Sequence, residues 1–165
     1  MPLSLRTTVE YPHQQIHEGR AFAVSSYDTD IDAAGPKYYR ISVPLGGLSP
    51  HLEMELTLKD AGIGELFEAP TLTGQGTDLV PVNRNRNSQN VATLVVAVDP
   101  TVSAPGTLLG FVRVPNAGSP SQPVGGMAYE RHEWLLRPGK NYLFRVTSDS
   151  DNNASWLAFN WYEAE

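Results

Sequence analysis

HLEMELTLK, residues 51–59, alternates polar and apolar side chains along its whole length. Successive side chains of a β-strand point to opposite faces, so Leu52, Met54, Leu56 and Leu58 would share one face and the polar residues the other. A helix would distribute the same apolar residues over different faces. The segment therefore predicts an antiparallel strand with one face on a core and the other in water.

Other segments show similar alternation or a high content of β-branched and aromatic residues. Only the stretch from Ala61 to Phe67 is expected to contain a helical turn. The two segments on either side of the Arg137–Lys140 turn are expected to form a hairpin. We predict an all-β chain, an antiparallel β-sandwich of about 8–10 short strands. The further predicted strands are Ala21–Tyr27, Lys37–Val43, Asn90–Val98, Thr107–Val114, Glu130–Leu136, Asn141–Thr147 and Ser155–Glu163.

The domain organisation is simple. Residues 1–18 carry little periodicity and are interpreted as an extended N-terminal arm, either disordered or ordered on a neighbouring molecule. Residues 19–165 are interpreted as a single β-sandwich domain. Glycine and proline punctuate it throughout, and two long loops, Pro70–Asn90 and Pro115–Tyr129, are candidates for functional segments.

Composition narrows the classes of function. The chain of 165 residues has no cysteine, which excludes disulfides, thiolate zinc sites and a cysteine nucleophile. Its net charge of −6 disfavours binding to a phosphate backbone, so we expect no nucleic-acid partner. The sequence has no apolar run of membrane-spanning length and no pattern of a secretory leader near its start, so we expect no membrane partner.

Two segments raise the question of a metal. His13 and His17 have a spacing that would hold a metal on a helix, but their segment contains Pro12 and shows no helical pattern. The run Asp28–Asp32 resembles the start of a calcium loop, but Ala33 stands where that loop has its glycine. We therefore interpret the first as part of a polar arm and the second as an acidic turn, and expect no metal and no cofactor.

No catalytic constellation is evident. Glu53 and Glu55 are interpreted as the solvated face of one strand, although paired carboxylates are also what a glycosidase needs. The sequence contains no nucleophile elbow, no phosphate-binding loop and no dinucleotide fingerprint. We expect no catalytic residues and a protein that is not an enzyme.

The segment NRNRNS, residues 83–88, is the least ordinary in the chain. On an extended backbone Arg84 and Arg86 would share one side, where each guanidinium could make two hydrogen bonds to a partner carboxylate. A solvated loop, in which asparagines favour turn conformations, explains the segment equally well. Both interpretations remain open from the sequence.

The aromatic residues concentrate toward the C-terminus. We interpret most of them as core, because aromatic side chains bury large areas. A carbohydrate-binding platform would instead require two or three coplanar exposed rings. The residues concerned are Trp134, Tyr142, Phe144, Trp156, Phe159, Trp161 and Tyr162.

Several short motifs, taken in their order, resemble a known family. They are IHEGRAF at 16–22, the Gly-Thr to Pro-Val run at 76–82, NRNRNS at 83–88, EWLLRPGKNYL at 133–143 and NWYE at 160–163. In this order the chain is similar to a group of small virion structural proteins of tailed bacteriophages. The resemblance extends over nearly the whole chain, from residue 16 to residue 163.

The resemblance implies a jelly-roll-like sandwich on the outer surface of the phage head. It implies a non-enzymatic decoration or cement protein, made in the host cytoplasm, that binds the major capsid protein as a homotrimer and stabilises the assembled head. A tail or baseplate adaptor and a carbohydrate-binding host-attachment module remain alternatives, and a polysaccharide hydrolase is a weaker one. The expected partner contacts are Tyr11, His13, His17, Asn83, Arg84, Asn85 and Arg86.

Overall fold

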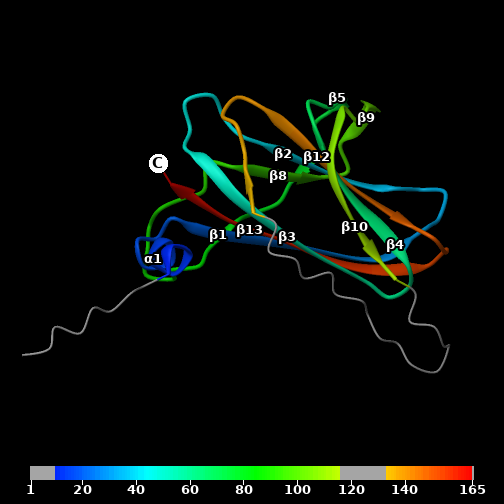
Figure 1. The fold of residues 1–165 in the computed structure, drawn as a ribbon, viewed down its shortest axis with the longest axis horizontal. Coiled ribbons are helices and arrows are strands. Elements are labelled where there is room, and N and C mark those ends of the chain that lie inside the picture. The colour runs from blue at the N-terminus through cyan, green and yellow to red at the C-terminus, as the bar shows by residue number, and fades with distance from the viewer. Residues whose placement is uncertain (1–9, 116–132, 165) are drawn as a thin grey trace, which may run out of the picture.

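The computed structural model of the chain describes residues 10–115 and 133–164, and strands dominate them (Figure 1). The expected all-β, antiparallel class is confirmed, since every strand pairing is antiparallel. In spatial order, sheet A consists of β11 (Trp134–Leu135), β3 (Ser49–Leu58), β13 (Asn153–Ala164), β1 (Ala21–Ile31) and β7 (Val82–Asn83). Sheet B consists of β10 (Thr107–Val114), β4 (Gly62–Glu68), β12 (Asn141–Ser148), β2 (Lys37–Ser42), β8 (Val95–Val98) and β6 (Thr77–Asp78). A small third sheet pairs β5 (Thr71–Gly74) with β9 (Thr101–Ala104).

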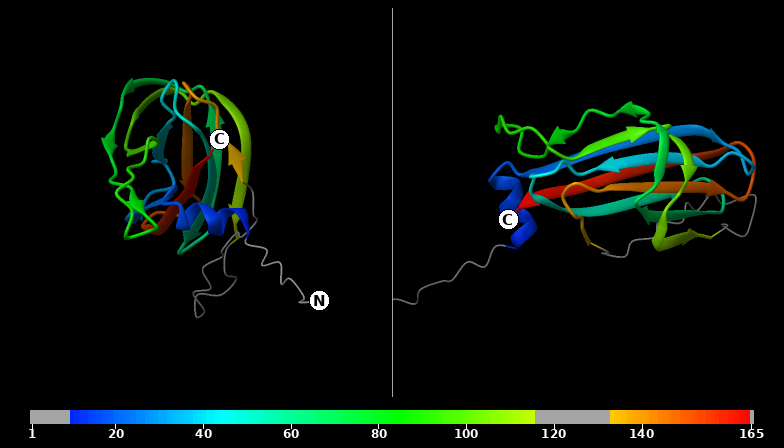
Figure 2. Two further views of the ribbon diagram at one scale, coloured as in Figure 1. Left: turned by 90° about the vertical axis from the view of Figure 1, so that its left-hand side faces the viewer. Right: turned by 90° about the horizontal axis from the view of Figure 1, so that it is seen from above.

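Sheets A and B enclose one hydrophobic core. Phe159 of sheet A is fully buried, and its ring contacts Tyr39 and Phe144 of sheet B at centroid distances of 5.7 and 6.0 Å. One contiguous cluster of buried residues draws members from both sheets. Figure 2 shows the corresponding layers in two further views. This arrangement is compatible with the predicted β-sandwich.

Strand β3 behaves as its alternation predicts. Leu52, Leu56 and Leu58 are buried in the core, whereas Glu53 and Glu55 lie partly exposed on the other face. The strand pairs with β13 along its whole length, from Ser49 to Leu58. Local side-chain chemistry therefore places this strand correctly.

The predicted hairpin around Arg137–Lys140 is wrong. Strand β11 pairs with β3 in sheet A, whereas β12 pairs with β2 and β4 in sheet B. The turn carries the chain from one sheet to the other, and it is held by hydrogen bonds between Val43 and both Gly139 and Lys140. Two strands joined by a short turn have the same alternation whether they pair with each other or not, so the pattern alone misassigned them.

The expectation of an extended chain is wrong for the part of the N-terminal arm that the structure describes. Tyr11–His17 form a seven-residue helix, α1, with Pro12 in its first turn. Proline is tolerated there because its missing N–H would have no partner within the helix. Residues 1–9 of the predicted arm lie outside the described residues.

Further strand boundaries also differ from prediction. The Ala61–Phe67 stretch, where a helical turn was expected, is almost wholly strand β4. The expected loop Pro70–Asn90 contains β5, β6 and β7, and the acidic turn begins later because β1 continues to Ile31. The predicted strand Asn90–Val98 is extended only from Val95.

Other parts of the prediction fall beyond what is described. The Pro115–Tyr129 loop lies, after its first residue, outside the described residues, as do residues 130–132 of a predicted strand. No helix within the described ranges is long and apolar enough to cross a membrane.

Candidate partner-binding surface

Helix α1 lies against the outer face of sheet A, at the left in Figure 1. Ile16 packs on a small apolar cluster formed by Ala21, Tyr162 and Ala164. The Tyr11 ring meets the Tyr162 ring edge-on, at a centroid distance of 5.7 Å. The helix is therefore attached to the sheet by apolar contacts near both of its ends.

The helix ends in a turn that only glycine fits. Gly19 has φ +70°, and its N–H donates to the Ile16 carbonyl while the Arg20 N–H donates to the Gln15 carbonyl. This pair of bonds is the Schellman arrangement that terminates many helices. A methyl group at Gly19 would lie 2.2 Å from Oγ of Ser88, so the turn also brings the 83–90 segment close to the helix.

Asparagine side chains join the 83–90 segment to the end of helix α1. Asn83 donates from Nδ2 to the carbonyl oxygens of Gly19 and Asn90, at 2.8 and 3.0 Å. Asn85 donates from Nδ2 to the carbonyl of His17 at 2.9 Å, and the Asn90 amide also donates to Gly19. The bonds to His17 and Gly19 satisfy carbonyls that a helix C-terminus leaves without partners. The asparagines thus support the backbone and are not free for a partner.

The two arginines behave differently from the asparagines between them. Arg84 and Arg86 are both exposed, and the Arg86 guanidinium makes a long contact of 3.5 Å with the Asn83 carbonyl. The Arg84 backbone N–H donates to the Ala21 carbonyl, which fixes its Cα position beside β1. As the alternation predicts, the asparagines and the arginines point to opposite sides of the segment. The asparagines bond the backbone of the chain, and the arginines are exposed to solvent.

The structure brings all of the predicted contact residues together. Asn85 bonds directly to the last residue of α1, so the helix and the Asn-Arg segment form one continuous region, which we term the α1 surface. Of the predicted contact residues, those exposed to solvent are Tyr11, His13, His17, Arg84 and Arg86. Asn83 and Asn85 are partly buried beneath them.

A buried glutamate supports the other side of this region and was missed from the sequence. The Glu163 carboxylate accepts hydrogen bonds from the backbone N–H of Thr93 and Leu94, from Thr93 Oγ1 and from Trp161 Nε1, at 2.8–3.1 Å. These bonds satisfy the backbone N–H groups of Thr93 and Leu94, which lie just before β8 and do not pair with a neighbouring strand. A Glu at an inward-facing position of a strand indicates that its carboxylate accepts buried hydrogen bonds, but the sequence does not show which groups donate them.

A second missed cluster lies beside α1. Glu133 accepts a hydrogen bond from the Tyr162 hydroxyl and also bonds His51, whose ring stacks on the Tyr162 ring at 4.5 Å. Burial, reinforced by the Glu133 carboxylate, raises the pKa of Tyr162 well above its ordinary value, so the hydroxyl stays protonated and acts as a donor. The cluster stabilises the sheet face on which the helix sits.

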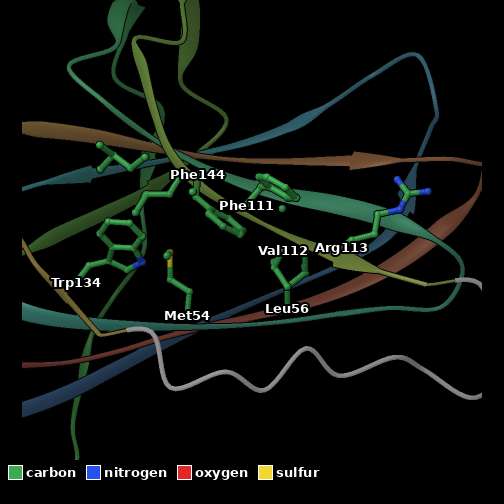
Figure 3. A pocket seen from close by; sticks show the side chains of 11 residues that line it. Met54, Leu56, Phe111, Val112, Arg113, Trp134 and Phe144 are labelled. Atoms are coloured by element: carbon green, nitrogen blue, oxygen red, sulfur yellow. The ribbon is translucent and has the colours of Figure 1, made fainter.

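A cleft of about 510 Å³ opens elsewhere, between edge strand β10 and the β3–β11 edge of sheet A (Figure 3). Trp134 lies at one end and Arg113 at the other, with Met54 and Phe144 in the wall. Arg113 is paired with Asp149. The volume falls in the range of small-molecule sites, and the mainly apolar lining is also typical of them.

Most of the C-terminal aromatic residues are core, as expected. Phe144, Phe159 and Trp161 are buried. Trp156 is an exception at 39 % exposure, and it faces Tyr27, 67 % exposed, on the neighbouring strand. Two exposed rings opposite each other on neighbouring strands are one element of what a carbohydrate platform requires.

The acidic run is occupied by its own chain. Asp28 lies 2.9 Å from Lys37 Nζ, and this contact lowers the pKa of the Asp28 carboxyl. Asp32 accepts a hydrogen bond from the Asn152 N–H. Within residues 10–115 and 133–164 no cluster of three or more His, Asp or Glu side chains is arranged around a common metal position.

Comparison with known proteins found no protein-family model and no curated protein that matches this chain.

Proposed function

We propose that the chain is a non-enzymatic virion structural protein of a tailed phage, a decoration protein that binds the outside of the assembled head as a homotrimer and stabilises it. The observation that carries the proposal is the order in which the strands pair, which supports assignment to the jelly-roll fold. The family resemblance of the motifs adds to it.

Eight of the strands pair in a nested order. In chain order, β1 pairs with β13, β2 with β12, β3 with β11 and β4 with β10. The first strand thus pairs with the last of this set, the second with the next to last, and so on inward. A long hairpin wrapped into two sheets gives this order, which is that of the jelly rolls common in viral capsid proteins. Strands β5 to β9 are an excursion between the fourth and fifth strands of the roll.

The α1 surface has the properties of a protein-binding region. Its backbone is held by the Asn83 and Asn85 amides, so little ordering remains to oppose binding. Arg84 and Arg86 project from it and suit carboxylates of a capsid subunit. A protein that binds only the assembled shell stabilises that shell by mass action, and repeated contacts act together.

The proposal predicts that changing both Arg84→Ala and Arg86→Ala weakens co-sedimentation with expanded empty shells of the cognate phage by about a hundredfold, from two lost charge-assisted contacts of ~1.4 kcal/mol each. The fold should be unaffected, because both side chains are exposed. The matched control is Lys59→Ala with Arg113→Ala, which removes the same charge from elsewhere on the surface. Equal loss in both double variants, or loss in neither, would refute a specific role of the α1 surface.

The exposed Trp156–Tyr27 pair favours one second candidate, a carbohydrate-binding attachment module. Glycan-array binding that disappears in Trp156→Ala would support this candidate over head decoration.

Solution mass measured with and without shells tests the trimer and the capsid partner directly. A trimer that sediments with shells supports decoration, and a protein that leaves shells untouched contradicts it.

A further inference from the structure

His13 and His17 form a close pair on the exposed side of helix α1. One helical turn separates them, and their Nε2 atoms lie 3.0 Å apart with ring centroids at 4.7 Å. Both side chains are exposed to solvent. The sequence disfavoured a metal because this segment near the N-terminus lacked a helical pattern, contained Pro12 and offered no third ligand. The first two reasons no longer hold, since the segment is a helix with Pro12 in its first turn.

The separation of the two nitrogens matches that of a chelated metal ion. Two metal–nitrogen bonds of about 2.0–2.1 Å place their nitrogens about 2.9 Å apart when they meet at a right angle and about 3.4 Å apart at the tetrahedral angle. The observed 3.0 Å lies between these values and nearer the right angle. The separation of the two Nε2 atoms therefore fits square-planar or octahedral coordination.

The choice of tautomer in the two rings also permits chelation. The Nε2–Nε2 contact requires a hydrogen on one of these atoms, whose ring donates to the other. In the tautomer with hydrogen on Nδ1, each neutral ring offers a lone pair at Nε2. A metal ion takes the place of the shared hydrogen when the donor ring changes tautomer, without a change in net ring charge.

The helix that carries the pair is held in place by three of its residues. Asn85 binds the His17 carbonyl, Tyr11 contacts Tyr162, and Gln15, between the two histidines, is 2 % exposed. Since the helix does not have to form when the ion binds, the affinity is not reduced by a folding cost.

We propose that His13 and His17 form a two-ligand chelating site for a late first-row divalent ion, of the Cu²⁺, Ni²⁺ or Zn²⁺ type. This inference does not depend on the proposed function. Because the described residues bring no third His, Asp or Glu side chain to the site, the remaining coordination positions are open to water or to a partner's side chain. Affinity follows the order Cu²⁺ above Ni²⁺ and Zn²⁺, with Mg²⁺ not bound, since Mg²⁺ prefers oxygen ligands.

The test is calorimetric titration of the untagged full-length chain with CuCl₂, NiCl₂, ZnCl₂ or MgCl₂ in a non-chelating buffer. We expect one Cu²⁺ per chain, with an electron paramagnetic resonance spectrum of two imidazole nitrogens in the equatorial plane. His13→Ala and His17→Ala should each lower Cu²⁺ affinity by about tenfold or more, because either change removes the chelate. Their thermal unfolding should match that of the unchanged protein, since the rings are exposed.

The chain supplies its own control. His51 and His132 are the other histidines of the sequence, and His51 belongs to the cluster beneath α1. The control is therefore His132→Gln, which should bind Cu²⁺ as the unchanged protein does. Affinity that persists in both single alanine variants would overturn the proposal. So would a resonance spectrum with only one nitrogen ligand, or loss of binding in His132→Gln alone.

Discussion

At the scale of single residues, the buried carboxylate of Glu163 holds the segment before β8 against strand β13. Its carboxylate is 5 % exposed and accepts four hydrogen bonds, three of them from Thr93 and Leu94. A buried carboxylate is tolerated only where such donors replace water. The segment before β8 therefore stays in place although it makes no strand ladder there.

Removing this carboxylate should be costly. We expect Glu163→Ala to lower the free energy of unfolding by about 3–5 kcal/mol, because the buried donors lose their acceptor. Glu163→Gln keeps one acceptor oxygen, so we expect a smaller loss of about 1–2 kcal/mol. Urea unfolding followed by tryptophan fluorescence measures both.

The control for Glu163 is Glu53→Ala, on the outer face of sheet A. We expect it to change stability by about 0.5 kcal/mol or less. Similar losses at both positions would contradict a special role for the buried carboxylate.

At the scale of elements, α1 is stable because of its surroundings. A helix of seven residues is too short to persist alone in water. Its Schellman turn, the Asn83 and Asn85 amides and the contact with Tyr162 supply what its length does not. The helix and the 83–90 segment should therefore loosen together.

Gly19→Ala tests this coupling. The new methyl group would meet Ser88 at 2.2 Å, and φ of +70° disfavours alanine, so we expect a loss of about 1–3 kcal/mol. Amide hydrogen exchange should accelerate in α1 and in residues 83–90 more than in β12. Gly35→Ala, where nothing lies within 4 Å, is the control and should leave exchange unchanged. Faster exchange in α1 alone would show that the two segments are not coupled.

At the scale of the whole molecule, the two sheets depend on a shared core. Phe159 from sheet A contacts Tyr39 and Phe144 from sheet B, and all three are buried. Neither sheet could keep its apolar face out of water alone. The chain should therefore unfold as one cooperative unit.

Phe159→Ala should lower the free energy of unfolding by about 3–5 kcal/mol, because a large cavity opens between the sheets. Thermal unfolding should keep a single transition at a lower midpoint. Phe111→Ala, at a position 69 % exposed, removes the same atoms and should cost much less. A second transition in Phe159→Ala would indicate that the sheets fold independently.

The sequence by itself determined the all-β class, most of the long strands and which side of β3 is buried, because side-chain alternation is a local property. It did not reveal β4 or the short strands β5, β6 and β7, which are too short or too irregular in pattern to stand out. It also singled out Tyr11, His13, His17, Arg84 and Arg86, which are all exposed on the α1 surface. Pro12 counted against a helix in the sequence, although proline is common in a first helical turn, where it lies here. A seven-residue helix is too short to show an apolar stripe.

Only the tertiary structure decided which strands are partners and what the asparagines do. Strand pairing joins residues far apart in the chain, and alternation is the same for every candidate partner, so the Arg137–Lys140 turn was misread as a hairpin. The bond from Asn85 to His17 spans 68 residues, and no local pattern encodes it. That contact joins the two candidate segments into one surface. The helix at its end places the Nε2 atoms of His13 and His17 3.0 Å apart.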